Sequence, residues 1–262
     1  MTSNKVLVEQ IEGVGIIRLN DPDWLNALTA EMVEQLDEAF DRCAGSCRAI
    51  LLTSVGRAFS SGVNLAGGQP IEDENGQVDL GLFLERHVNP LIARLAELPI
   101  PWISGVRGAA AGVGCSLALA ADLIVASESA YFLQAFAKVG LVPDGGASWL
   151  LARAVGRPRA LELMLLGERL DAAKALQWGL INRLVADEEL ESASLELAFA
   201  LASGPTKTLA MIRQLARQGA DGNFIELLAA ERAAQRRCGL THDAIEGVTA
   251  FIEKRPARFI GS

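Results

Sequence analysis

The chain has 262 residues, half of them hydrophobic, which is enough for one large α/β core with or without an appendage. A formal net charge of −8 makes the surface as a whole repel phosphate backbones, so we expect no nucleic-acid partner. The sequence shows no charged-then-apolar leader and no apolar run long enough to cross a bilayer. We therefore expect a cytoplasmic protein with no membrane partner.

The cysteines and histidines do not have the spacing of a metal site. The four cysteines contain no CxxC pair, and His87 and His242 lie far apart in the sequence. This pattern favours reduced thiols in a reducing compartment. We therefore expect no metal ligands.

The first part of the chain predicts a hairpin, a helix and a strand. Two short apolar runs around a turn predict a β-hairpin over residues 5–20. Apolar residues at helical spacing predict an amphipathic helix over 30–44, and the compact apolar run 48–54 predicts a strand. A polar, glycine-rich loop follows over about 56–79.

The middle of the chain repeats the alternation of helix and strand. Residues 80–98 carry an apolar stripe at helical spacing, with a kink expected at Pro90. Strands are predicted over 101–106 and 122–127, separated by a glycine-bearing turn and the helix 115–121. This alternation predicts α/β layers around a buried sheet.

From Ala147 onward the pattern is nearly all helical, with breaks at glycines. The chain therefore divides into a core over 1–200 and a C-terminal helical region over 201–262. The later helices carry apolar stripes that a single core need not bury, although an intramolecular helix layer is the alternative interpretation. These stripes are formed by Leu209, Ile212, Leu215, Phe224, Leu227 and Leu228.

Two glycine turns precede helices and have similar composition. They are "GRAFSSGVNL" (56–65) and "GAAAGVGCSL" (108–117). Each can aim free backbone N–H groups outward, which suits an anion or an oxyanion, although a tight structural turn explains either one alone. The dinucleotide fingerprint, the P-loop and the GxSxG nucleophile elbow are all absent from the sequence.

A carboxylate stands in "GLVPDGGASW" (140–149). Asp144 precedes an apolar stretch, where an aspartate favours capping the N-terminus of a helix. A carboxylate beside apolar residues can also serve as a general base, because desolvation raises its pKa. Taken alone, these ten residues favour the cap.

Four motifs in sequence order resemble the crotonase superfamily of enoyl-CoA hydratases and isomerases. These are "GRAFSSGVNL", "GAAAGVGCSLALAADL", "GLVPDGGASWLLARAVG" and "GVTAFIEKRPARF", and the resemblance extends over essentially the whole chain. It implies a ββα spiral core that binds acyl-CoA over 1–200 and a helical trimerisation region over 201–262. It also implies a homotrimer or a dimer of trimers.

The resemblance also assigns binding residues. It implies that the N–H groups of Ser61 and Val113 hold the thioester oxygen, and that coenzyme A is bound as part of the substrate, with no other tightly bound cofactor. Phe251 and Lys254 match positions that reach the coenzyme A of a neighbouring subunit, whereas a solvated charge is the default for Lys254 taken alone. The coenzyme A loop comprises Arg57, Phe59, Ser60, Ser61, Asn64 and Leu65.

The sequence departs from the hydratase pattern at two positions. Hydratases of this superfamily hold water between two glutamates, and the matching positions here are Ser116 and Phe136. Serine is too weak a base and phenylalanine cannot exchange protons, so hydration by two carboxylates is not expected. Asp144 matches the single acid/base carboxylate of the isomerases, which favours a base over a cap. The expected pocket wall includes Phe83, Phe136 and Leu141.

The resemblance therefore implies an acyl-CoA isomerase that stabilises a thioester enolate. The expected substrates are the ring-1,2-epoxide of phenylacetyl-CoA, as in phenylacetate catabolism, or a Δ3-enoyl-CoA, as in fatty acid metabolism. An enoyl-CoA hydratase is the alternative within the family. A CoA thioesterase built on Ser61, His87 and Asp144, and a non-catalytic CoA-binding protein, are alternatives of another class.

Overall fold

A hairpin opens the fold in the computed structural model, which describes residues 4–64 and 72–262. Strand β1 (Val6–Ile11) pairs antiparallel with β2 (Val14–Leu19), as the sequence predicts. The turn between them uses Glu12 and Gly13, both with positive φ. The remaining pairs of the main sheet are parallel, in the order β1-β2-β3-β4-β6-β9. The added strands are β3 (Ala49–Ser54), β4 (Trp102–Val106), β6 (Leu123–Ser127) and β9 (Arg183–Val185).

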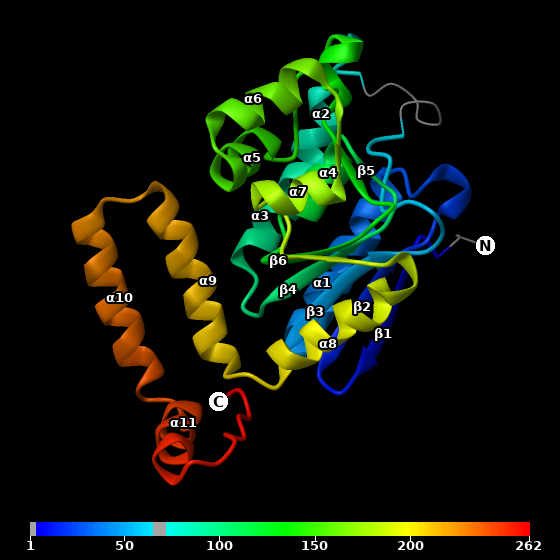
Figure 1. Ribbon diagram of the computed structural model, residues 1–262. Helices are drawn as coiled ribbons and strands as arrows, with labels where there is room; N and C mark the ends of the chain where they lie inside the picture. Colours follow the sequence, from blue (N-terminus) through cyan, green and yellow to red (C-terminus); the bar gives the residue numbers. More distant parts are fainter. Residues whose placement is uncertain (1–3, 65–71) are drawn as a thin grey trace.

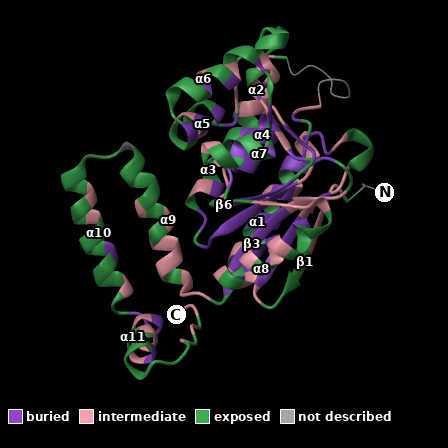
Figure 2. Cartoon of the chain, viewed as in Figure 1, coloured by how far each residue is buried: buried purple, intermediate pink, exposed green. Residues whose placement is uncertain are grey.

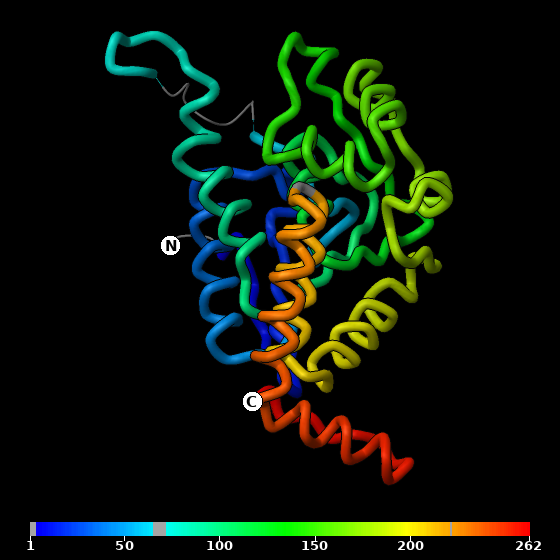
Figure 3. Tube along the Cα trace, turned by 90° about the vertical axis from the view of Figure 1, so that its left-hand side faces the viewer, coloured from blue at the N-terminus to red at the C-terminus, as the bar shows by residue number. Residues whose placement is uncertain are grey.

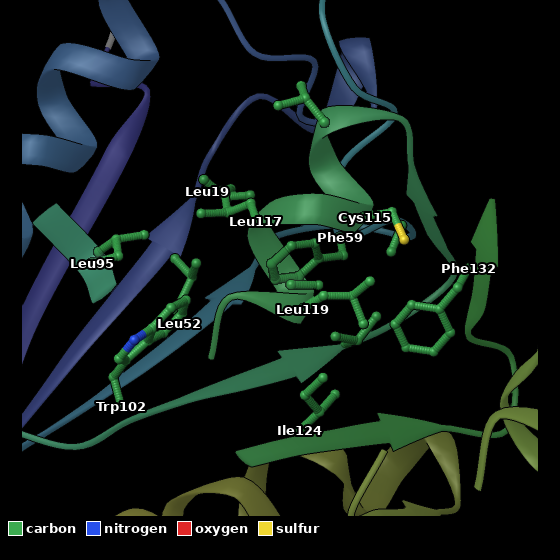
Figure 4. Close-up of a cluster of buried hydrophobic side chains, with 14 of the residues drawn as sticks. Leu19, Leu52, Phe59, Leu95, Trp102, Cys115, Leu117, Leu119, Ile124 and Phe132 are labelled. Carbon is green, nitrogen blue, oxygen red and sulfur yellow. The ribbon is translucent and has the colours of Figure 1, made fainter. Parts of the chain in front are cut away.

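Successive residues of the central strands point to opposite faces of this sheet, and each face has its own cluster of buried side chains. Helix α8 (Leu190–Ala202) covers the face that carries Ile16, Leu51 and Ile103. The larger cluster lies on the other face, under α1 (Ala30–Ser46) and α4 (Val113–Leu119). Figure 4 draws part of the larger cluster, including Leu52, Leu95, Phe59 and Trp102.

The predicted helix over 80–98 consists of three consecutive segments. These are α2 (Gly81–Phe83), the π-helical turn η2 (Leu84–Val88) and α3 (Asn89–Glu97). Pro90 has no N–H to donate, and the chain widens just before it, with the Asn89 N–H donating to the carbonyl five residues back. The irregularity expected at Pro90 is therefore a π-helical turn.

A second, smaller sheet follows the order β5-β7-β8 and was not predicted from the sequence. Its strands are β5 (Ala109–Ala111), β7 (Tyr131–Leu133) and β8 (Arg169–Asp171). Each has three residues, too few to establish an alternating pattern. Because β8 and β9 both follow Ala147, the expectation of an almost wholly helical second half was too simple. The helices that follow Ala147 in this region are α5 (Ala147–Val155), α6 (Arg157–Leu166) and α7 (Ala172–Trp178). The described residues also form three short 3-10 turns, η1 (Pro22–Trp24), η3 (Ala135–Val139) and η4 (Asp187–Glu189).

The last three helices form an arm beside the core, as Figures 1 and 3 show. They are α9 (Thr206–Asp221), α10 (Phe224–Cys238) and α11 (His242–Glu253). Figure 2 shows that α10 is largely exposed, whereas α11 mixes exposed residues with half-buried and buried ones. Within residues 4–64 and 72–262, no helix has both the length and the hydropathy that a membrane span requires.

Two arginines fasten the arm to the core. Arg213 of α9 pairs with Asp122 and donates to the carbonyl of Leu98. Arg48, just before β3, donates to the Thr206 hydroxyl at the start of α9 and to the Phe259 carbonyl near the end of the chain. The Arg48 side chain thus contacts both the beginning of the arm, at Thr206, and the segment that follows its last helix, at Phe259.

Candidate active site

Asp144 lies in the loop between η3 and α5, and its carboxylate does not cap the helix. The N-cap of α5 is Gly146, which has φ 81, and no side chain donates or accepts there. The main-chain carbonyl of Asp144 accepts the Ala147 N–H at 3.0 Å and the Ser116 hydroxyl at 2.9 Å. The capping interpretation is therefore wrong.

The carboxyl group of Asp144 is largely withdrawn from water. Its Oδ1 atom is buried and has no hydrogen-bond partner among the described residues. Burial raises the pKa of Asp144 to about 6, and a hydrogen bond from its own N–H has the smaller, opposite effect. A carboxylate with this pKa is available near neutral pH and is a stronger base than an ordinary aspartate.

The apolar wall expected around Asp144 is only partly present in the single chain. Phe136 is half-buried, and its ring lies against Gly112, where an added Cβ would be 3.5 Å from Cζ. Leu141 is 37% exposed, so its place in the pocket wall stays a prediction. Phe83 packs partly against the main core beside His87, with ring centroids 5.4 Å apart.

The loop of Asp144 packs on the first turn of α4. A Cβ added to Gly145 would lie 3.0 Å from Val113 Cγ2, and φ there is +56°, so glycine suits the position on both counts. Val113 is the first residue of α4, and no atom of residues 4–64 or 72–262 accepts its N–H. The loop that carries Asp144 therefore packs against the residue whose N–H has no acceptor within the described ranges.

The first predicted donor, Ser61, requires a correction. Its N–H donates to the Leu25 carbonyl at 3.0 Å, so it is already occupied. Two residues later, the Val63 N–H finds no acceptor in the described part of the chain. Val63 pairs in parallel with Leu28, whose N–H and carbonyl bond to Gly62 and Asn64, so the N–H of Val63 points away from Leu28.

Val63 and Val113 occupy matching places on two touching segments. Ser60 pairs in parallel with Ala110, three residues before each valine. The segments meet at Gly62 and Gly112, where a Cβ added to Gly112 would lie 3.9 Å from the Gly62 Cα. The paired glycine turns predicted from the sequence thus do come together, and the two unaccepted N–H groups follow their point of contact.

The side chains of the predicted coenzyme A loop point in different directions. Phe59 and Ser60 are fully buried, the first in the core drawn in Figure 4, so only their backbone can reach a ligand. The Ser60 hydroxyl donates to the Asn26 carbonyl at 2.8 Å. Arg57 is exposed, Asn64 is half-buried, and the predicted contact at Leu65 falls outside the described residues.

Phe251 and Lys254 are at the far end of the molecule from the loop of Asp144. Phe251 is in the last turn of α11 and Lys254 is its C-cap, and Figure 1 shows this helix at the end of the molecule opposite α5 and α6. Phe251 is 85% exposed. One chain does not bring these two residues to Asp144.

The hydrolytic arrangement of Ser61, His87 and Asp144 is not assembled. His87 Nδ1 lies 3.6 Å from a carboxylate oxygen of Glu34, which belongs to α1. The Ser61 hydroxyl donates to the Trp24 carbonyl instead. A thioesterase built on this triad is therefore not supported.

Comparisons with known proteins agree on one family. The family model described as enoyl-CoA hydratase/isomerase matches residues 9–262. The 1,2-epoxyphenylacetyl-CoA isomerase of Escherichia coli (strain K12) is 42% identical, covering 95% of this chain and 96% of its own. A "Probable enoyl-CoA hydratase" of Rhodobacter capsulatus is 39% identical over the full length of both chains. The crystal structure of an enoyl-CoA hydratase from Polaromonas sp. JS666 matches with a TM-score of 0.89 and 30% identity, covering 97% of this chain and 99% of that one.

Proposed function

The chain belongs to the enoyl-CoA hydratase/isomerase family and has the crotonase fold, and we propose that it is an acyl-CoA isomerase. Asp144 is its acid/base. The N–H groups of Val63 and Val113 form the oxyanion hole that holds the thioester oxygen.

The reaction requires these groups to act together. A thioester α-proton is too weakly acidic for a carboxylate in water, so the two N–H donors stabilise the enolate oxygen as charge develops on it. Asp144 removes a proton from the carbon next to the thioester carbonyl and returns it at another position of the acyl group. For a Δ3-enoyl substrate, the proton leaves C2 and returns to C4, which moves the double bond into conjugation.

The observation that carries this proposal is one half-buried carboxylate, that of Asp144, with a buried oxygen that has no partner among the described residues. The buried oxygen is Oδ1, and the Asp144 loop packs on Val113, whose N–H has no acceptor in the described part of the chain. The two positions that matched the hydratase glutamates hold Ser116, which is fully buried, and Phe136. One carboxylate suffices for moving a proton, whereas activating water and protonating carbon in one step calls for two.

The substrate class we propose is a thioester of phenylacetate whose ring carries a 1,2-epoxide, with Δ3-enoyl thioesters second. The name of the 42% identical relative from Escherichia coli supports the first. The test is a panel of ring-epoxide, Δ3-enoyl and Δ2-enoyl CoA thioesters, with isomerisation followed for each. Absence of isomerisation with every thioester of the panel contradicts the proposal.

Hydration is the second candidate, because the 39% identical relative is named as a hydratase. With Ser116 and Phe136 in place of carboxylates, we expect hydration of crotonyl-CoA to be weak or absent. If the protein hydrates crotonyl-CoA as fast as it isomerises its best substrate, hydratase becomes the favoured function and isomerase the second candidate.

We further propose that coenzyme A binds through the backbone of 57–65, and that Phe251 and Lys254 reach it from a neighbouring subunit of a trimer or a dimer of trimers. The exposure of Phe251 and the distance of α11 from Asp144 support a role across subunits. Calorimetry with acetyl-CoA and free CoA tests this, and no binding at millimolar ligand contradicts it. We place the protein in the cytoplasm, where free thiols such as its cysteines persist.

A further inference from the structure

The hydroxyl group of Ser116 has no part in the proton transfer described above. Ser116 lies on α4, one turn after Val113, and its side chain is fully buried. It therefore cannot touch a substrate, and a hydroxyl is too weak a base to replace a carboxylate. Its place beside Asp144 nevertheless points to a role in the same site.

The Ser116 hydroxyl has two carbonyl oxygens within reach and only one proton to donate. The Asp144 carbonyl lies 2.9 Å from Oγ, and the Gly112 carbonyl lies 3.4 Å away. The Gly112 carbonyl already accepts two N–H groups of α4, at 3.0 and 3.2 Å. The shorter contact to the less occupied acceptor is the better hydrogen bond, so the proton goes to Asp144.

The two segments joined by this bond are in close contact. A Cβ added to Gly145 would lie 2.9 Å from Ser116 Cβ and 3.0 Å from Val113 Cγ2. The loop of Asp144 therefore rests on the same turn of α4 that provides the Val113 N–H. The Ser116 hydrogen bond adds a directed link between the loop and the helix to this packing.

We propose that Ser116 is a positioning residue, whose buried hydroxyl ties the main chain of Asp144 to the helix that carries the Val113 N–H. This inference rests on the isomerase function proposed above and extends it to a residue that never meets the substrate. The base and the oxyanion donor are thereby held as one unit.

Loss of the hydroxyl leaves the Asp144 carbonyl with one donor, the Ala147 N–H, which belongs to the same turn and not to α4. The loop then gains freedom relative to Val113, and its carboxyl group gains access to water. A base displaced by about 1 Å can lose about a hundredfold in rate without any change in its chemistry.

The chain offers a matched control. Ser104 of β4 is also fully buried, and its hydroxyl also donates to a carbonyl of α4, that of Ala118, at 2.9 Å. Ser104→Ala and Ser116→Ala therefore each remove one hydrogen bond from a buried hydroxyl to a carbonyl, and α4 contributes one partner to each bond. The first bond is remote from Asp144 and the second holds it.

The experiment measures kcat, KM and the pH dependence of kcat/KM for isomerisation in the wild type and both variants. We expect Ser116→Ala to lower kcat by about ten- to a hundredfold with KM within about threefold, and Ser104→Ala to leave both almost unchanged. Ser116→Cys, which fills the space with a weaker donor, should fall between wild type and Ser116→Ala.

Infrared pH titration provides a readout that is independent of turnover. The signal is the band of the protonated Asp144 carboxyl group, identified by its absence in Asp144→Asn. We expect the pH at which half of this band is lost to be lower in Ser116→Ala than in the wild type or in Ser104→Ala. Equal kcat and equal midpoints in the two alanine variants overturn the positioning role. If the wild type isomerises no thioester, the proposed function fails, and the titration alone then decides the role of Ser116.

Discussion

At the scale of single residues, the sequence alone could not decide between two roles for Asp144. A cap and a base use the same residue type before a helix, and the choice depends on the backbone angles of Gly146 and on the burial of Oδ1. Neither can be predicted from the order of residues. The resemblance to crotonases pointed to the base, and the missing cap bond agrees with it.

Asp144→Asn is expected to lower isomerase kcat by about a hundredfold or more, because the side chain keeps its shape and loses its basicity. The carboxylate caps no helix, so the substitution should not lower the melting temperature. Steady-state kinetics and thermal unfolding of the same variant measure both effects. A stable Asp144→Asn enzyme with wild-type turnover contradicts the catalytic role.

The pKa of Asp144 also predicts how the protein responds to pH. A carboxyl whose folded-state pKa is raised from 3.8 to about 6 favours folding while it is protonated, and this contribution is lost as pH rises from about 4 through about 6. Asp144→Asn should therefore melt higher than the wild type at pH 8 and not at pH 4. In the wild type, kcat/KM should rise with pH through about 6 as the base loses its proton. A flat kcat/KM profile from about one pH unit below this pKa to about one unit above it argues against Asp144 as the base.

At the scale of elements, the glycine turns were predicted correctly as a pair, but the position of the first donor was not. The orientation of the Val63 N–H depends on pairing with Leu28, and the Ser61 N–H is occupied by Leu25. Both partners lie more than 30 residues earlier in the chain, so no local pattern reveals them. The three-residue strands β5, β7 and β8 were missed because they are too short to show a period.

Gly145→Ala tests how closely the Asp144 loop packs on α4. Gly140→Ala is the control, because Gly140 also has positive φ and a Cβ there meets nothing within 4 Å. We expect Gly140→Ala to cost about 1–2 kcal/mol for backbone strain, and Gly145→Ala a further 1–3 kcal/mol for overlap with Ser116 and Val113, with a loss of kcat. Urea unfolding measures the difference, and equal costs with equal turnover show that the contact is unimportant.

At the scale of the whole molecule, the alternation of strands and helices predicted an α/β core, and the structure has one. The division at residue 200 remains a prediction, although the chain is helical from Leu190 onward apart from its connections and its tail. The direction in which the arm leaves the core was not predictable, because it depends on the Arg213–Asp122 pair and on contacts of Arg48. Apolar side chains remain exposed along the arm, namely Ile212, Phe224, Ile225, Leu228, Ile245, Val248, Phe251 and Ile252.

We expect these exposed side chains to be covered in a trimer or a dimer of trimers. Light scattering should report one of these masses at micromolar concentration. Ile245→Asp on α11 should reduce the mass, because a charge cannot be buried there without a partner. Leu165→Asp on α6, where the side chain is similarly exposed, is the control and should leave the assembly intact. A monomeric wild type contradicts both the assembly and the contribution of Lys254 across subunits.

The return of the chain to Arg48 has a practical consequence for handling the protein. The buried Asp243 accepts the N–H groups of Ile260 and Gly261, and its own N–H donates to the carbonyl of Ser262. Residues 260–262 thus connect back to the start of α11 through Asp243, next to the contact between Arg48 and Phe259. We therefore expect an affinity tag or fusion partner joined to Ser262 to disturb the hydrogen bonds of Asp243 that orient α11.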